Sequence, residues 1–164
     1  MKLKKRLSIL FCLTVSMFLA GTVGTADSYA EQIALSSGQT VYVPVYSHIY
    51  SGVKGRPFDL TATLSLRNTD LKNPITLVSV KYYDSDGTLV KNYLNGPKQL
   101  DKLVSARYII PEGDKTGGSG ANFIVVWQAQ GPVNPPIIEA VMIGTHSGQG
   151  ISFVSRGQVL KEDR

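Results

Sequence analysis

Apolar and polar side chains alternate along most of the chain with a period of two residues, which predicts β-strands. The alternation is clearest in residues 58–66, where every even-numbered residue is apolar and every odd-numbered residue is polar. Such a strand buries one face and exposes the other. Outside residues 1–30, no stretch of the sequence has a sustained helical period. We therefore predict an all-β protein, with further strands at residues 40–46, 75–83, 88–93, 103–110, 123–129, 137–143 and 151–155.

Turn-forming residues separate these strands at short intervals. Asp84-Ser85-Asp86-Gly87 suits a tight hairpin, because glycine adopts a positive φ angle without steric cost. Apolar residues on both faces of residues 123–127 indicate a central strand, with Trp127 in the core. About seven to eight short strands favour a β-sandwich, with an immunoglobulin-like arrangement as the first choice and a small closed β-barrel as the alternative. We expect the tail, residues 158–164, to be frayed.

The first 30 residues have the pattern of a cleavable export signal. A basic start is followed by an apolar run over residues 7–20 and then by Ser28-Tyr29-Ala30, a small-x-small sequence. The apolar run is shorter than the ~20 residues that a membrane-spanning helix needs. Thr22 stands where a lipoprotein signal would have its cysteine. We predict a signal peptide at residues 1–30, a single β-sandwich domain at residues 31–164, and a periplasmic or secreted location without a stable membrane span after cleavage.

Removal of this signal changes both the charge and the thiol content of the chain. Four of the 17 basic residues and one of the 12 acidic residues lie in the signal, which leaves 13 and 11 and a net charge of +2. The remaining basic residues are scattered singly, without the stripe that phosphate binding produces, so we expect no nucleic-acid binding. The single cysteine, Cys12, also lies in the signal. The mature domain then has no disulfide and no cysteine nucleophile, and a hydrophobic core must stabilise it.

Several segments of the chain are similar to those of a known family. The most distinctive are Thr116-Gly117-Gly118-Ser119-Gly120-Ala121-Asn122-Phe123 and Glu139-Ala140-Val141-Met142-Ile143-Gly144-Thr145. Together with residues 41–50, 66–70, 82–87 and 150–157, they resemble the uncharacterised bacterial family catalogued as domain of unknown function 3124, and the likeness extends over nearly all of the mature chain. The resemblance implies a bacterial protein that is exported or membrane-tethered, and it implies no particular activity. Some members of the family are lipoproteins, and Thr22 departs from that pattern.

A glycine-rich segment, residues 111–122, is the first candidate binding site. Successive glycines let backbone amides converge on an anion, and a neighbouring lysine can add charge. The lysine precedes the glycines and a strand follows them, so the segment does not fit a nucleotide-binding loop. The spacing Gly117-x-Ser119-x-Ala121 approaches the nucleophile elbow of hydrolases, which needs a helix, a histidine and an acid. A tight hairpin connection is the structural alternative, and the candidate residues are Lys115, Gly117, Gly118, Ser119, Gly120 and Asn122.

A stripe of aromatic residues is the second candidate. On an extended chain one face carries Tyr42, Pro44, Tyr46, His48 and Tyr50, while the intervening valines share the other face and point to the core. Tyrosine rings suit stacking on sugars or docking of a partner segment. Because Pro44 lacks an N–H group, we expect this strand at a sheet edge, where a partner strand can add. The alternative is that another loop or sheet covers the rings.

Metal chemistry finds little support in the sequence. His48 and His146 are the only histidines, and they lie far apart without the spacing of a zinc site. Asp84 and Asp86 are ligands that calcium accepts, but a hairpin turn explains the same residues. We predict no metal and no cofactor.

These observations favour a non-enzymatic binding or assembly domain in the bacterial cell envelope, with an envelope protein or a glycan as partner. Two alternatives stay open. One is a periplasmic sensor of a small ligand or ion that uses the Gly117–Gly120 loop. The other is a hydrolase that uses Ser119 with His48 or His146.

Overall fold

The alternation seen in the sequence becomes a set of antiparallel strands. The computed structural model describes residues 34–51, 54–146 and 148–163, and the predicted signal peptide lies outside these residues. All regular secondary structure in the described ranges is β, which confirms the predicted all-β class. The strands are β1 (Ser36–Pro44), β2 (His48–Ser51), β3 (Arg56–Asp59), β4 (Thr61–Arg67), β5 (Ile75–Tyr83), β6 (Leu89–Asn92), β7 (Lys98–Leu100), β8 (Ser105–Ile110), β9 (Asn122–Val133), β10 (Ile137–His146), β11 (Gln149–Arg156) and β12 (Gln158–Asp163).

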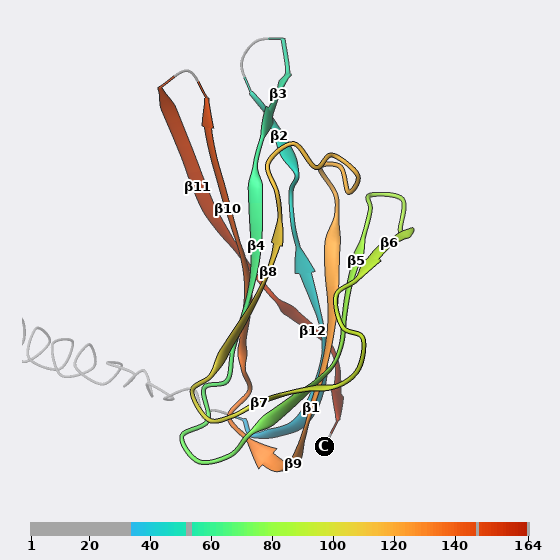
Figure 1. Ribbon diagram of the computed structural model, residues 1–164, viewed down its shortest axis with the longest axis vertical. Coiled ribbons are helices and arrows are strands. Elements are labelled where there is room, and N and C mark those ends of the chain that lie inside the picture. The colour runs from blue at the N-terminus through green and yellow to red at the C-terminus, as the bar shows by residue number, and fades with distance from the viewer. Residues whose placement is uncertain (1–33, 52–53, 147, 164) are drawn as a thin grey trace, which may run out of the picture. The chain divides into compact units, whose positions relative to one another are not determined.

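These strands form two larger open sheets and one small ribbon. The first sheet has the order β12-β1-β9-β5-β6, with β7 pairing to the beginning of β5, and the second has the order β11-β10-β4-β8. Strands β2 and β3 form a separate two-stranded ribbon at one end of the molecule (Figure 1). Within the described residues the sheets stay open, so the alternative prediction of a closed barrel is wrong.

The core lies between the two larger sheets, where their inward faces meet. Leu64 on β4, Val125 and Trp127 on β9, and Met142 on β10 are all fully buried. Full burial of a leucine-sized side chain contributes roughly 1.5–3 kcal/mol, so this layer is the main source of stability. The position of Trp127 in a central strand confirms the prediction for that residue.

The described strands number twelve, more than the seven or eight predicted. The predicted strand at residues 58–66 is divided at Leu60 into β3 and β4, which belong to different sheets. Strands β2 and β7 are only four and three residues long, too short for a recognisable alternation. The pattern of burial is therefore predictable here, whereas the division of a run between two sheets is not.

The tail provides the clearest correction. We expected residues 158–164 to be frayed, but Gln158–Asp163 forms β12, which pairs antiparallel with β1 from Gly38 to Tyr42. Nearly all of its side chains are exposed, so no hydrophobic pattern marks it as a strand. Its backbone pairs with β1, and a side-chain hydrogen bond from Gln39 Nε2 to Glu162 Oε2 (2.8 Å) adds to this pairing.

Strand β12 also overturns the expectation that β1 is an edge strand. β1 lies between β12 and β9, so both of its sides are paired over Gly38–Tyr42. Pro44 lies beyond the last pair with β12, Tyr42 with Gln158, and pairs only with Asn122 of β9. The missing N–H group of Pro44 therefore interrupts no pairing with β12. In the part of the chain that the structure covers, there is no helix with the length and hydrophobicity needed to cross a membrane.

Candidate binding site

The aromatic stripe runs from the large sheet into the β2–β3 ribbon. Val41, Val43 and Val45 are buried, as predicted for the face opposite the stripe. The stripe residues on the other face are half-buried from Tyr42 to His48, and only Tyr50, at 62% exposure, projects fully into solvent. The stripe is therefore covered along most of its length and open at the end of the molecule.

Tyr46 has a packing role within this stripe. Its ring lies 5.7 Å from that of Phe153 on β11, in an edge-to-face arrangement. Both side chains are half-buried against the main core. Such aromatic pairs are worth about 0.5–1.5 kcal/mol beyond the area that they bury. Tyr46 thus joins the chain between β1 and β2 to the second sheet.

The glycine-rich segment connects β8 to β9 and lies against the turn between β5 and β6. Ser85 N and Ser85 Oγ both donate to the carbonyl of Gly117, each at 2.9 Å, and the amide of Gly120 donates to Ser85 Oγ at 2.9 Å. The amide of Gly118, whose φ angle is +73°, donates to the carbonyl of Lys115. The amide of Thr116 donates to Asp114 Oδ1. These amides are therefore engaged in holding the loop, which matches the structural alternative for the glycines.

The structure brings the stripe and the glycine loop together at Ser47. Both the amide and the hydroxyl of Ser47 donate to the carbonyl of Gly118, at 3.2 and 2.9 Å. The amide of Val45 donates to the carbonyl of Ala121 at 2.9 Å, so this stretch runs alongside the loop. The aromatic stripe and the glycine loop thus form one surface, although Ser47 and Gly118 are 71 positions apart in the chain.

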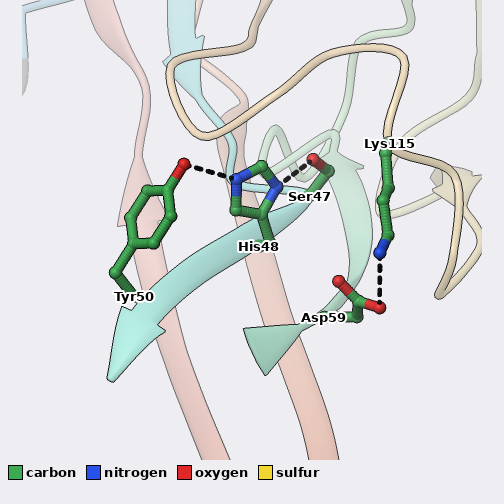
Figure 2. A network of polar contacts seen from close by, with 5 residues as sticks. All are labelled: Ser47, His48, Tyr50, Asp59 and Lys115. Atoms are coloured by element: carbon green, nitrogen blue, oxygen red, sulfur yellow. Dashed lines mark hydrogen bonds and ion pairs between the residues drawn. The ribbon is translucent and has the colours of Figure 1, made fainter. Parts of the chain in front are cut away.

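A chain of polar contacts continues from Ser47 to the solvent (Figure 2). Ser47 Oγ lies 3.2 Å from His48 Nδ1, and His48 Nε2 lies 3.2 Å from the hydroxyl oxygen of Tyr50. The two rings stand almost perpendicular, with centroids 5.2 Å apart and an angle of 88° between their planes. Because Ser47 is only 2% exposed, the chain joins an exposed ring to a buried anchor.

The lysine of the loop is paired with an acid that the sequence analysis did not single out. Lys115 Nζ lies 3.2 Å from Asp59 Oδ2, as Figure 2 shows. Asp59 Oδ1 is buried without a hydrogen-bond partner among the described residues. The ion pair ties the loop to β3 and neutralises the charge that we expected to assist anion binding. The sequence does not distinguish Asp59, because it is one of several polar residues in an alternating run.

The remaining candidate residues have separate surroundings. Asn122 opens β9 and pairs with Pro44 and Tyr83 on its two sides. Ser119 is half-buried in the loop, and His48 engages Ser47 and Tyr50 with its two ring nitrogens.

The hairpin aspartates and the metal prediction can also be placed. Asp84 Oδ1 accepts hydrogen bonds from the amides of Asp86 (3.0 Å) and Thr88 (2.7 Å), as a turn requires. Over the described ranges there is no group of three or more His, Cys, Asp and Glu side chains arranged to hold a metal ion.

An aromatic cluster lies beneath the glycine loop. Tyr82 is 1% exposed and packs against Phe123 with ring centroids 5.1 Å apart, and Tyr93 packs against Phe123 at 5.6 Å. The hydroxyl of Tyr82 is buried without a hydrogen-bond partner among the described residues. Burial, with a smaller contribution from the charge of Asp114, raises the pKa of Tyr82 to about 12. This hydroxyl therefore stays protonated at neutral pH, and it supports the loop as a packing surface.

The fold and this surface define a small antiparallel β domain whose candidate site is built from loops at one end of its sheets. The model of the family described as "Protein of unknown function (DUF3124)" matches residues 38–160, and the chain belongs to this family. This confirms the resemblance found in the sequence. No curated protein matches the chain.

One solved structure is also similar, the crystal structure of Thermotoga maritima 1070. It has 11% sequence identity and a TM-score of 0.42, and the match covers 73% of this chain and 92% of that one.

Proposed function

We propose that the protein is a non-enzymatic binding or assembly domain of the bacterial cell envelope. Its contact surface is the end of the molecule where the β2–β3 ribbon meets the glycine loop. The observation that carries this proposal is the exposed ring of Tyr50, held by His48 and, through Ser47, by the carbonyl of Gly118. The partner is an envelope protein or a glycan.

The arrangement suits recognition because it orders the ring before a partner arrives. An exposed tyrosine loses side-chain freedom when it is buried in an interface, at a cost of about 0.5–1.5 kcal/mol. Contact with His48 removes part of that freedom in the free protein. Aromatic side chains with a polar tip also dominate binding energies in interfaces, and they stack well on sugar rings.

Export and location in the envelope rest on the sequence of residues 1–30, with its basic start, apolar run and small-residue exit. The proposal also includes an immunoglobulin-like relationship of the sheets, supported by antiparallel strands in two open layers around one core. In such folds, loops gathered at one end of the sheets commonly form the binding surface.

The two alternative functions gain less support from the same geometry. A sensor that uses the Gly117–Gly120 loop needs free backbone amides, and those of Gly118 and Gly120 are engaged within the fold. A hydrolase that uses Ser119 needs a histidine beside it, and both ring nitrogens of His48 contact other side chains. Labelling of Ser119 by a fluorophosphonate probe would revive the hydrolase hypothesis.

Crosslinking in intact cells tests the proposed surface. A photoreactive phenylalanine analogue is placed at position 50, and at position 71 in a control protein. Leu71 is 66% exposed, close to the 62% of Tyr50, and it lies in the β4–β5 connection at the opposite end of the sheets. We expect a defined crosslinked product from position 50 alone.

Competition then shows whether that product reflects specific binding. Excess wild-type protein should suppress the crosslink, Tyr50→Phe should suppress it less well because it loses the hydroxyl contact with His48, and Tyr50→Ala should fail, because the ring supplies most of the contact. Equal crosslinking from both positions, or equal competition by Tyr50→Ala, would remove the ribbon end from the proposal.

A further inference from the structure

A shallow hollow of about 310 Å³ lies on the outward face of the four-stranded sheet, away from the ribbon end. Its walls come from β4, β8 and β10. Two arginines, Arg67 and Arg107, line it together with three residues that carry hydroxyl groups and two aliphatic residues. These five are Thr63, Ser65, Ser105, Ala106 and Val141.

The register of the strands explains why these groups converge. Arg107 lies directly opposite Ser65, and Ser105 lies directly opposite Arg67, so the two arginines are diagonal neighbours on adjacent strands. All four point to the same face, because side chains alternate with a period of two. Diagonal neighbours lie roughly 7–8 Å apart, within reach of both long side chains. The guanidinium groups can therefore contact one ligand together.

A hydrogen bond orients one of the two arginines, Arg67. Arg67 Nε donates to Ser65 Oγ at 3.1 Å, which directs this guanidinium toward the strand position opposite Arg107. Neither arginine forms an ion pair within the described residues, whose two ion pairs are Lys115 with Asp59 and Lys161 with Asp163. The walls of the hollow contain no carboxylate.

The same face does carry an acid nearby, Glu139 on β10, directly opposite Ser65. Glu139 is in turn directly opposite Arg156 on β11. This row across the sheet therefore holds one acid between arginines on either side. Together with Arg67, the face keeps a positive excess beside the hollow. Like charges on neighbouring strands are destabilising, and a bound anion would offset that repulsion.

We propose that this hollow binds an oxyanion carried on a hydroxylated molecule, such as a sugar or polyol that bears a phosphate or carboxylate group. Two guanidinium groups recognise the oxygens of such an anion through charge-assisted, forked hydrogen bonds. The three hydroxyl side chains can donate to and accept from the hydroxyl groups of the carrier. Val141 offers an apolar surface to its carbon skeleton. The site is separate from the ribbon end and does not depend on the function proposed for it.

Calorimetric titration of the purified protein tests this site with two probes, glycerol 3-phosphate and glucuronate, at matched ionic strength. Binding of the first assigns the site to a phosphate ester, and binding of the second assigns it to a uronic acid. Arg67→Gln and Arg107→Gln should each weaken binding about tenfold or more, as expected for loss of a charge-assisted contact. Arg156→Gln, a matched charge change on the same face outside the hollow, should change the affinity less than twofold.

Substitution by lysine sharpens the test, since it keeps the charge and removes the fork. Arg67→Lys and Arg107→Lys should lose most of the affinity that the glutamine variants lose. Absence of binding to both probes at millimolar concentration would overturn the proposal. So would an equal loss in Arg156→Gln, which would indicate general attraction to a positive surface. Unchanged melting temperatures of the variants, expected for exposed arginines, exclude misfolding as the cause of any loss.

Discussion

Gly117 offers the sharpest test of whether the glycine loop has a structural role. A Cβ atom at this position would overlap the hydroxyl of Tyr82 and lie 2.5 Å from Tyr82 Cζ and 2.8 Å from Ala121 Cβ. Gly117→Ala therefore inserts a methyl group where no space exists. Tyr82 is 1% exposed and cannot swing into solvent, and Ala121 is equally buried. The strain must be taken up by the backbone of the loop or by the aromatic cluster beneath it.

The size of the effect follows from general experience with overpacked cores. An inserted methylene costs typically about 1–3 kcal/mol, and we expect the upper end here because three atoms are too close. A glycine in open space would behave oppositely, since alanine reduces the entropy of the unfolded chain and stabilises by about 0.4–1 kcal/mol. For a domain of this size, 3 kcal/mol corresponds to a decrease in melting temperature of about 12 °C.

Urea unfolding followed by tryptophan fluorescence measures this change, because the single tryptophan, Trp127, is fully buried. Gly96→Ala is the matched control, since a Cβ at Gly96 would have no atom within 4 Å. Tyr82→Phe alone should be neutral or slightly stabilising, because it removes a buried hydroxyl without a partner. The double variant Gly117→Ala/Tyr82→Phe should recover only part of the loss, since the ring itself stays in place. Unchanged stability of Gly117→Ala would refute the packing argument, and Gly117 would then stay a candidate binding residue.

Three further predictions concern other parts of the fold. Several backbone amides donate hydrogen bonds to the carboxylate of Asp70 and lower its pKa, and the amide of Lys72 has the largest effect. The charged carboxylate therefore stabilises the fold above the unfolded pKa of about 4, and this stabilisation is lost as pH falls through the lower folded pKa. Stability measured by urea unfolding should accordingly fall more steeply below pH 4 in the wild type than in Asp70→Asn. Trp127→Phe removes the hydrogen bond that Trp127 Nε1 donates to Gln39 Oε1 and leaves this buried oxygen without its partner, which should lower the free energy of unfolding by about 2 kcal/mol in the same assay. Deletion of residues 158–164 uncovers the side of β1 that pairs with β12, and in size-exclusion chromatography the shortened chain should then associate more strongly than the intact chain.

The sequence by itself determined the strands that have one solvent-exposed face and one buried face. β5 was predicted at its observed bounds, and the turn after it was recognised from Asp84 and Gly87, whose φ angle is +80°. These features are local: burial of alternate residues and the conformational freedom of glycine act within a few positions of the chain. The alternation also located the buried valines of β1, and the continuous apolar run over residues 123–127 located Trp127 in the core.

Pairing between distant segments was decided only by the tertiary structure. Nearly all side chains of β12 are exposed, and it exists as a strand because β1 lies beside it. In the same way Ser47 meets Gly118, Lys115 meets Asp59, and Arg67 becomes a neighbour of Arg107. A period of two specifies which face a side chain occupies, but it does not specify which strand lies next to it or in what register. Both candidate surfaces depend on which strands are neighbours and on their register, because each surface is assembled from strands and loops that meet only when the sheets are formed.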